Sequence, residues 1–254
     1  MTGLAGQRAV QLAFLALALG AWQTLTATGM VSPLFLPSPA AVYTALARLL
    51  GTAAFWSAVE VTLATIAKAY GIAVALGLAA GYLVTRSRFW TEVFEPIVSG
   101  LFTIPITLFF PMFILFFGVG AGSKVAYGAT YGFFPVALSA IAGLSGVDER
   151  YLRAARSMGA SRLDTFRHVL APSALPTLLT GLRVGFFICF ASVLGGEALS
   201  SIAGVGRNIA LSAELMESAR MYAWIAVVVA AAVSLNFALS WIESRASTWE
   251  GLSR

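Results

Sequence analysis

Charged residues inside long apolar runs are the first candidates for chemistry in this 254-residue sequence. Lys68 lies within the apolar run 57–84, and Glu197 lies near the end of the run 174–199. If these runs cross a membrane, such side chains normally face a bundle interior or a water-filled cavity, because lipid does not solvate them. Both are therefore candidates for a translocation pathway, where a lysine favours an anionic solute. The alternatives are an ion pair between Lys68 and a neighbouring helix, and helix capping or local pairing by Glu197.

The sequence shows no group of residues with the types and spacing that catalysis or metal binding requires. The single histidine, His168, and the single cysteine, Cys189, are not spaced with carboxylates as metal ligands are. The run Gly118–Lys124 (GVGAGSK) resembles a phosphate-binding loop, but Ser123 separates its last glycine from the lysine and Val125 replaces the required hydroxyl residue. We therefore expect no metal, no catalytic site and no cofactor in this chain, which is not expected to be an enzyme.

The composition predicts a helical membrane protein. Hydrophobic residues make up 59% of the sequence, charged residues 11%, and the mean hydropathy is +0.86. A soluble domain usually carries about 25% charged residues. The apolar runs approach the roughly 20 residues that a helix needs to cross a bilayer, and they are longer than the strands of a membrane barrel. We expect an all-α integral membrane fold of about six transmembrane helices, at 9–29, 57–84, 92–117, 124–145, 174–199 and 221–242.

The distribution of basic residues predicts the orientation, since cytoplasmic loops are enriched in Lys and Arg. With the N-terminus inside, the cytoplasmic side receives Arg8, Arg86, Arg88, Arg150, Arg153, Arg156, Arg162, Arg167, Arg183, Arg245 and Arg254. The outer side receives Arg48, Lys124, Arg207 and Arg220. We therefore expect both termini to be cytoplasmic. The net charge of +5 reflects these short loops and does not indicate a nucleic-acid partner.

Prolines predict irregular backbone at two places. The segment 33–39 (PLFLPSP) is expected to be a stiff external connector, and Ser38 with Pro39 suits the start of a short helix at 39–50. Pro105 and Pro111 lie within the third predicted span, where they free backbone carbonyls and favour a kink or a break. Pro105 is either part of a packing kink or part of a hinge or cavity wall in the pathway.

A polar island at 148–172 interrupts the apolar runs. Asp148 and Glu149 suit the positive N-terminal end of a short helix. An apolar stripe of this helix is formed by Tyr151, Ala155 and Met158. The island holds five of the sixteen basic residues, Arg150, Arg153, Arg156, Arg162 and Arg167.

A second short helix is predicted to follow in the island. Gly159 suits the left-handed residue that ends the first helix, Ser161 and Asp164 form a capping pattern for the second, and Pro172 is expected to end it. Helices this short are unstable unless they pack on something. The island therefore predicts a compact knob that docks on a soluble partner; the alternative is an ordinary solvated basic loop.

The knob also carries a family signature. Ala154 and Ala155 are followed by Gly159 four residues later and, after nine intervening residues, by Val169-Leu170-Ala171-Pro172. This spacing resembles the signature loop of ABC-importer permeases, which reads Glu-Ala-Ala, three residues, Gly, nine residues, Ile-x-Leu-Pro. Further stretches resemble the nitrate/sulfonate/taurine-type permeases, at Leu36–Pro39, Phe113–Gly118, Ala154–Arg162, Glu197 and Gly204–Gly206.

The resemblance covers roughly residues 32–245 and implies one domain, 1–254, with a type I ABC importer permease fold in a bacterial cytoplasmic (inner) membrane. It implies a coupling loop at about 146–173 that binds a cytoplasmic ABC ATPase dimer, with Arg153, Ala154, Ala155, Gly159 and Pro172 as its coupling residues. It also implies ATP and Mg²⁺ on that ATPase, a second permease copy, identical or not, and an external solute-binding protein. The family has an acid at the position of Arg153, which puts an ion pair to the ATPase there in doubt.

The sequence thus predicts a permease subunit that moves a small anionic solute by alternating access. The resemblance leaves the solute open, since nitrate, sulfonates, bicarbonate and pyrimidine precursors all fit it. An ATP-independent channel or secondary carrier is the alternative, and it would show internal inverted repeats, which do not stand out here. A membrane scaffold without transport would explain the basic loop but not Lys68 or the prolines of the third span.

Overall fold

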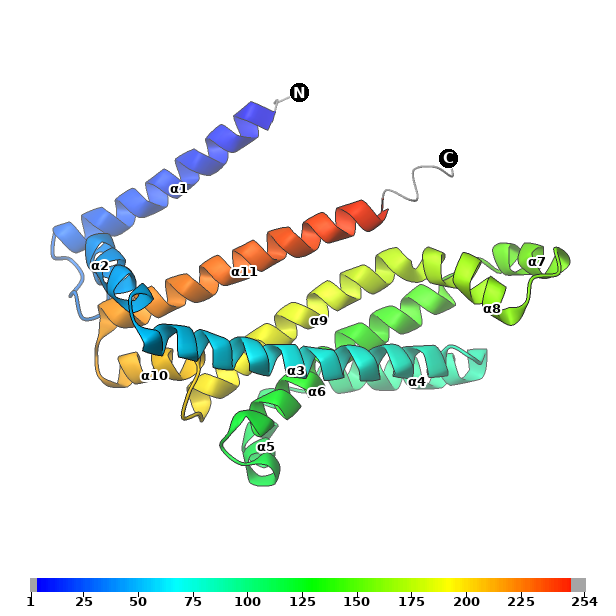
Figure 1. Cartoon of the computed structure of the whole chain (residues 1–254). Helices are drawn as coiled ribbons and strands as arrows, with labels where there is room; N and C mark the ends of the chain where they lie inside the picture. The colour runs from blue at the N-terminus through cyan, green and yellow to red at the C-terminus, as the bar shows by residue number, and fades with distance from the viewer. Residues whose placement is uncertain (1–3, 248–254) are drawn as a thin grey trace.

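Residues 4–247 are the part of the chain that the computed structural model describes, and every regular element in this range is helical (Figure 1). The predicted all-α fold is confirmed for this range. Residues 1–3 and 248–254, which include Arg254 of the orientation count, lie outside it. The predicted single domain 1–254 therefore stays a prediction at both ends.

Five of the described helices are long and apolar enough to cross a membrane, and a bent pair makes a sixth candidate span. The five are α1 (Leu4–Ala27), α3 (Ala53–Val84), α6 (Ala121–Ser145), α9 (Ala171–Leu199) and α11 (Ser218–Ser247). They lie where the apolar runs predicted them. The expectation of about six transmembrane helices is confirmed, because the length that a bilayer demands also sets the length of the helix.

The third predicted span is broken. Helix α4 (Arg88–Phe102) meets the following segment, made of the 3₁₀ turn η1 (Ile106–Phe109) and α5 (Phe110–Phe117), at an angle of 72°. Pro105 lies at the break and directly precedes η1, and it has no N–H with which to continue α4. Pro111 lies in the first turn of α5, where a proline is tolerated. The break that these prolines predicted is confirmed.

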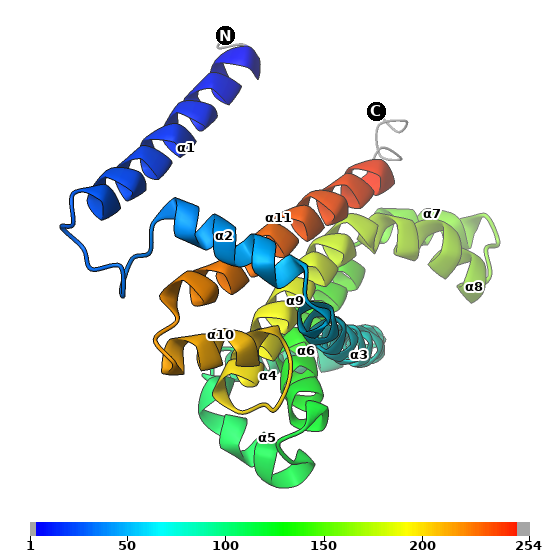
Figure 2. The same ribbon diagram turned by 60° about the vertical axis from the view of Figure 1, so that its left-hand side comes forward.

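Helix α6 is the centre of the bundle and packs between α3 and α9 (Figures 1 and 2). Small residues let the three helices approach closely, which in lipid replaces the hydrophobic drive of a soluble core. A Cβ added at Gly132 of α6 would lie 3.2 Å from the Cβ of Ala73 on α3 and 3.2 Å from the carbonyl oxygen of Gly185 on α9. The close packing of this three-helix core therefore depends on residues without large side chains.

Replacing Gly81 with isoleucine is expected to destabilise the three-helix core by about 1–3 kcal/mol, the usual cost of overpacking. A Cβ at Gly81 would lie 2.3 Å from the Cβ of Ala140 on α6, so the two helices must separate. Gly71→Ile on the same helix is the matched control, because a Cβ there meets nothing within 4 Å. Thermal unfolding in detergent measures the difference, and equal melting temperatures for the two variants would contradict it.

The end of the bundle opposite the knob is built from short helices. Helices α2 (Pro39–Leu50) and α10 (Val205–Glu214) lie there beside the start of α11 (Figure 1). Ser38 caps α2 by accepting the Ala41 N–H at 3.2 Å, as predicted. Helix α1 stands apart from the bundle, and none of its apolar span is buried (Figure 2). A shared cluster of buried side chains holds this end together: Val42, Leu49, Phe55, Ala58, Val205, Ala223 and Trp224.

Candidate coupling loop and pathway residues

The first helix of the knob is α7 (Glu149–Ser157), which follows the end of α6. The Asp148 carboxylate pairs with the Arg150 side chain at 2.7 Å and accepts the Arg150 backbone N–H at 2.8 Å. The side-chain hydrogen bond from Arg150, with the backbone one, lowers the pKa of Asp148, because both favour the ionised form. Helix α7 gives way to Gly159, whose φ of +77° confirms the left-handed glycine predicted there.

The second helix begins with the predicted capping pattern. Helix α8 (Arg162–Thr165) is capped by Ser161, whose hydroxyl accepts the Asp164 N–H at 3.2 Å, while the Asp164 carboxylate accepts the Ser161 N–H at 3.2 Å. The hydrogen bond from the Ser161 side chain also lowers the pKa of Asp164. These local contacts fix the turn between the two helices of the knob.

Pro172 does not end the second helix, which corrects the sequence prediction. Helix α8 passes through a π-helical turn, η2 (Phe166–Leu170), into α9, so that Arg162–Leu199 is one continuous helix. The Ala171 N–H bonds to the Phe166 carbonyl five residues back, and Pro172 falls in the first turn of α9. Proline inside a continuous helix lacks one backbone N–H donor, and the π-helical turn directly before it accommodates this gap, so the helix continues. The second half of the knob is thus a direct extension of a membrane span.

The rest of the described chain leaves most of the apolar surface of the knob exposed. Ala155 is 3% exposed, whereas Tyr151 is 64% exposed and Met158 80% exposed. A cleft of about 1160 Å³, lined in part by Arg156 and Arg162, separates the knob from the turn between α3 and α4. Exposed apolar side chains next to such a cleft suit contact with another protein chain better than contact with water.

Lys68 lies on an exposed face of α3, while its neighbours Thr65, Ile66 and Ala69 are buried against the bundle. It makes no hydrogen bond or ion pair with any residue in 4–247. The alternative of an ion pair with a neighbouring helix is therefore not formed within the described part of this chain. Its place in a pathway stays a prediction.

Glu197 is buried where α9 meets α3 and α10, and it is 2% exposed. Its carboxylate accepts the Thr62 hydroxyl at 2.8 Å and the Gly206 N–H at 3.0 Å. The Thr62 oxygen in turn accepts the Val205 N–H at 2.8 Å. Together they satisfy N–H groups at the start of α10 that have no partner within the helix. Of the alternatives for Glu197, helix capping is formed; its role in a pathway stays a prediction.

The three pathway candidates do not form one cluster. Pro105 is exposed at the break between α4 and η1, and no hydrogen bond or hydrophobic cluster in residues 4–247 joins it to Lys68 or Glu197. In the same residues, no three His, Cys, Asp or Glu side chains gather as metal ligands do.

Comparison with known proteins places these elements in a family. The model for the family described as "Binding-protein-dependent transport system inner membrane component" matches residues 73–248. The chain is also 31% identical over 253 residues to the taurine transport system permease protein TauC of Escherichia coli, covering 98% of this chain and 92% of that protein. The chain belongs to this permease family. It is a membrane-spanning permease subunit of an ABC importer.

More distant relatives of the permease agree. It is 27% identical over 206 residues to the putative aliphatic sulfonates transport permease protein SsuC of Bacillus subtilis, covering 81% of this chain and 75% of that protein. A chain of the inward-facing MetNI methionine ABC transporter matches with a TM-score of 0.65 and 19% identity, covering 75% of this chain and 96% of that chain. That structure confirms the fold expected of an importer permease. The family match includes the knob, Pro105 and Glu197, whereas Lys68 precedes it.

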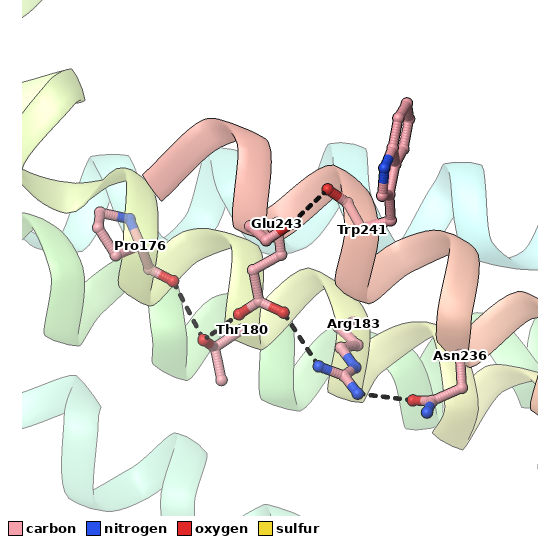
Figure 3. Close-up of polar contacts among 7 residues, drawn as sticks. Pro176, Thr180, Arg183, Asn236, Trp241 and Glu243 are labelled. Carbon is pink, nitrogen blue, oxygen red and sulfur yellow. Dashed lines mark hydrogen bonds and ion pairs between the residues drawn. The ribbon is translucent and has the colours of Figure 1, made fainter. Parts of the chain in front are cut away.

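Sequence reasoning missed one group of polar residues in the permease. Arg183 was counted as a cytoplasmic residue, but it lies inside α9 and pairs with Glu243 of α11, with Thr180 and Asn236 beside it (Figure 3). An arginine within a predicted span is the same signal that drew attention to Lys68. Its partner could not be named, because Glu243 is 60 positions away in the sequence.

Proposed function

We propose that the permease forms half of a transmembrane pathway and receives the closure of a cytoplasmic ABC ATPase dimer through its knob. The support is the knob itself: its capped first helix, α7, leaves Tyr151 exposed, Met158 directly after α7 is also exposed, and its second helix, α8, continues into the span α9. ATP and Mg²⁺ would be held by the ATPase, with no cofactor in the permease. The distribution of basic residues favours a cytoplasmic knob and cytoplasmic termini.

The solute that we propose is a small sulfonate or a related anion, delivered by an external binding protein. One relative is named for the transport of taurine and another for that of aliphatic sulfonates, and both kinds of solute carry a sulfonate group. Lys68, which no residue in 4–247 neutralises, supplies a positive charge within a span. The pathway would form against a second permease copy and would open alternately to either side, as the ATPase dimer shifts the population of the two states.

Reconstitution into liposomes with the cognate ATPase and binding protein tests this function. Uptake of labelled taurine or an alkanesulfonate is expected to require both ATP and the binding protein, and an ATPase is expected to copurify with the permease. Nitrate and bicarbonate serve as the competing anions, and preference for either would correct the solute alone. Uptake that proceeds without nucleotide would contradict the proposal and favour a channel or secondary carrier.

A further inference from the structure

Four polar side chains join α9 and α11. Arg183 lies 3.0 Å from the Glu243 carboxylate, and its other terminal nitrogen donates to the Asn236 side-chain oxygen at 2.6 Å. The Thr180 hydroxyl donates to the second Glu243 oxygen at 3.1 Å. Figure 3 shows that the two sets of side chains, one from each helix, point toward each other. We call Thr180, Arg183, Asn236 and Glu243 the α9–α11 network.

The network lies at the knob-side end of the candidate spans: Arg183 is inside the span of α9, and Glu243 lies just past the end of the α11 span at Trp241. At 1.5 Å per residue, Arg183 is about 18 Å from the start of α9 at Ala171 and about 24 Å from its end at Leu199. The side chains of Arg183 and Glu243 are 32% and 28% exposed. A charge within a span, such as that of Arg183, is retained where it pairs, because an unpaired charge is poorly solvated there. The pairing therefore strongly favours contact between the two helices.

The buried apolar clusters that α11 joins lie in the first two thirds of this helix. The buried clusters that α11 joins include Trp224 near its start and then Val228, Ala232 and Leu235. Beyond Leu235, Phe237 is 70% exposed and Leu239 is half-buried. The network adds an ion pair and two further hydrogen bonds between α9 and the segment Asn236–Glu243 of α11.

The network is also in line with the knob. Because Arg162–Leu199 is one helix, a displacement of α8 moves Arg183 with it. We propose that the α9–α11 network transmits the movement of the knob to α11, so that Arg183 and Glu243 position α11 for coupled transport; this rests on the proposed ATP-driven function. Allosteric coupling requires an element whose position is changed at one site and in turn affects another site.

A solute-binding role suits the network less well. An arginine that recognises an anion must offer free donors, whereas Glu243 already neutralises Arg183, and Asn236 occupies a second donor. A carboxylate at the same place would repel a sulfonate. The expected defect is thus in coupling rather than in affinity for the solute.

Charge exchange in the reconstituted importer tests the proposal. Arg183→Glu and Glu243→Arg alone are expected to lower the solute imported per ATP hydrolysed by about tenfold, within the usual range of allosteric coupling. The double exchange Arg183→Glu/Glu243→Arg is expected to restore most of the loss, since it restores the ion pair. If the single variants fail to fold, Arg183→Gln/Glu243→Gln removes both charges without leaving one unpaired, and it is expected to fold but to remain uncoupled.

Arg220→Met is the matched control. It breaks the ion pair between Arg220 and Glu217, which has the same 3.0 Å length but lies at the other end of α11 and does not connect α11 to α9. It is expected to leave the import ratio unchanged. Folded network variants with a normal import ratio would overturn the proposal. So would a rise in KM for the solute at a constant ratio, which would make Arg183 a solute-binding residue. Failure of the proposed function itself would appear in the unaltered importer as uptake without ATP.

Discussion

Replacing Ala154 with tryptophan is expected to leave the permease folded but to lower the solute imported per ATP hydrolysed by about tenfold or more. Ala154 is exposed on α7, so the chain itself has room for an indole there. In the proposed complex this small residue faces the ATPase, where an added indole would hold the knob away from its contact surface. ATP hydrolysis would then continue without moving the spans.

The neighbouring residue separates this effect from damage to the knob. Ala155 is 3% exposed, so Ala155→Trp is expected to distort α7 and to cost about 1–3 kcal/mol of stability as well. Ala47→Trp, an exposed alanine on the short helix α2 at the opposite end of the bundle, is the control for adding an indole to a surface helix. Uptake and ATP hydrolysis in the same liposomes give the ratio. A normal ratio for Ala154→Trp would remove the knob from coupling.

Local physical rules made much of the fold predictable. The spans follow from the length of apolar helix that lipid requires, and the start and turn of the knob follow from short-range contacts. Asp148 caps its own helix, Ser161 and Asp164 cap each other three residues apart, and Gly159 supplies the left-handed turn. The signal in each case lies within one turn of helix, so a single sequence suffices to find it.

The features that the sequence did not predict depend on contacts between segments far apart in the sequence, or on a balance between similar backbone conformations. Thr62 and Glu197 are 135 positions apart, and only the packing of α3 against α9 and α10 brings them together. Pro172 was assigned to a helix end, but a π-helical turn before it lets the helix continue. The 72° angle at Pro105 could not be predicted either, since a proline indicates a break without setting its direction.

Replacing Glu197 with leucine is expected to destabilise the permease by about 2–6 kcal/mol, because two buried donors lose their acceptor at about 1–3 kcal/mol each. The change would leave the Gly206 N–H without its acceptor and the Thr62 hydroxyl without its carboxylate. Lys124, which is 1% exposed and lies with its side chain against Gly196, would also lose the nearby negative charge. The α3–α9–α10 junction should therefore loosen first.

Two further variants decide whether capping is the cause. Thr62→Val removes the acceptor of the Val205 N–H, and combined with Glu197→Leu it should cost less than the sum of the single changes, because both act on one network. Glu60→Leu, on an exposed carboxylate of α3, is the matched control and should change the melting temperature little. If Glu197→Leu melts like Glu60→Leu yet abolishes uptake, the carboxylate serves the pathway rather than the junction. If it melts lower and the protein that remains folded transports normally, Glu197 acts through the α10 cap alone.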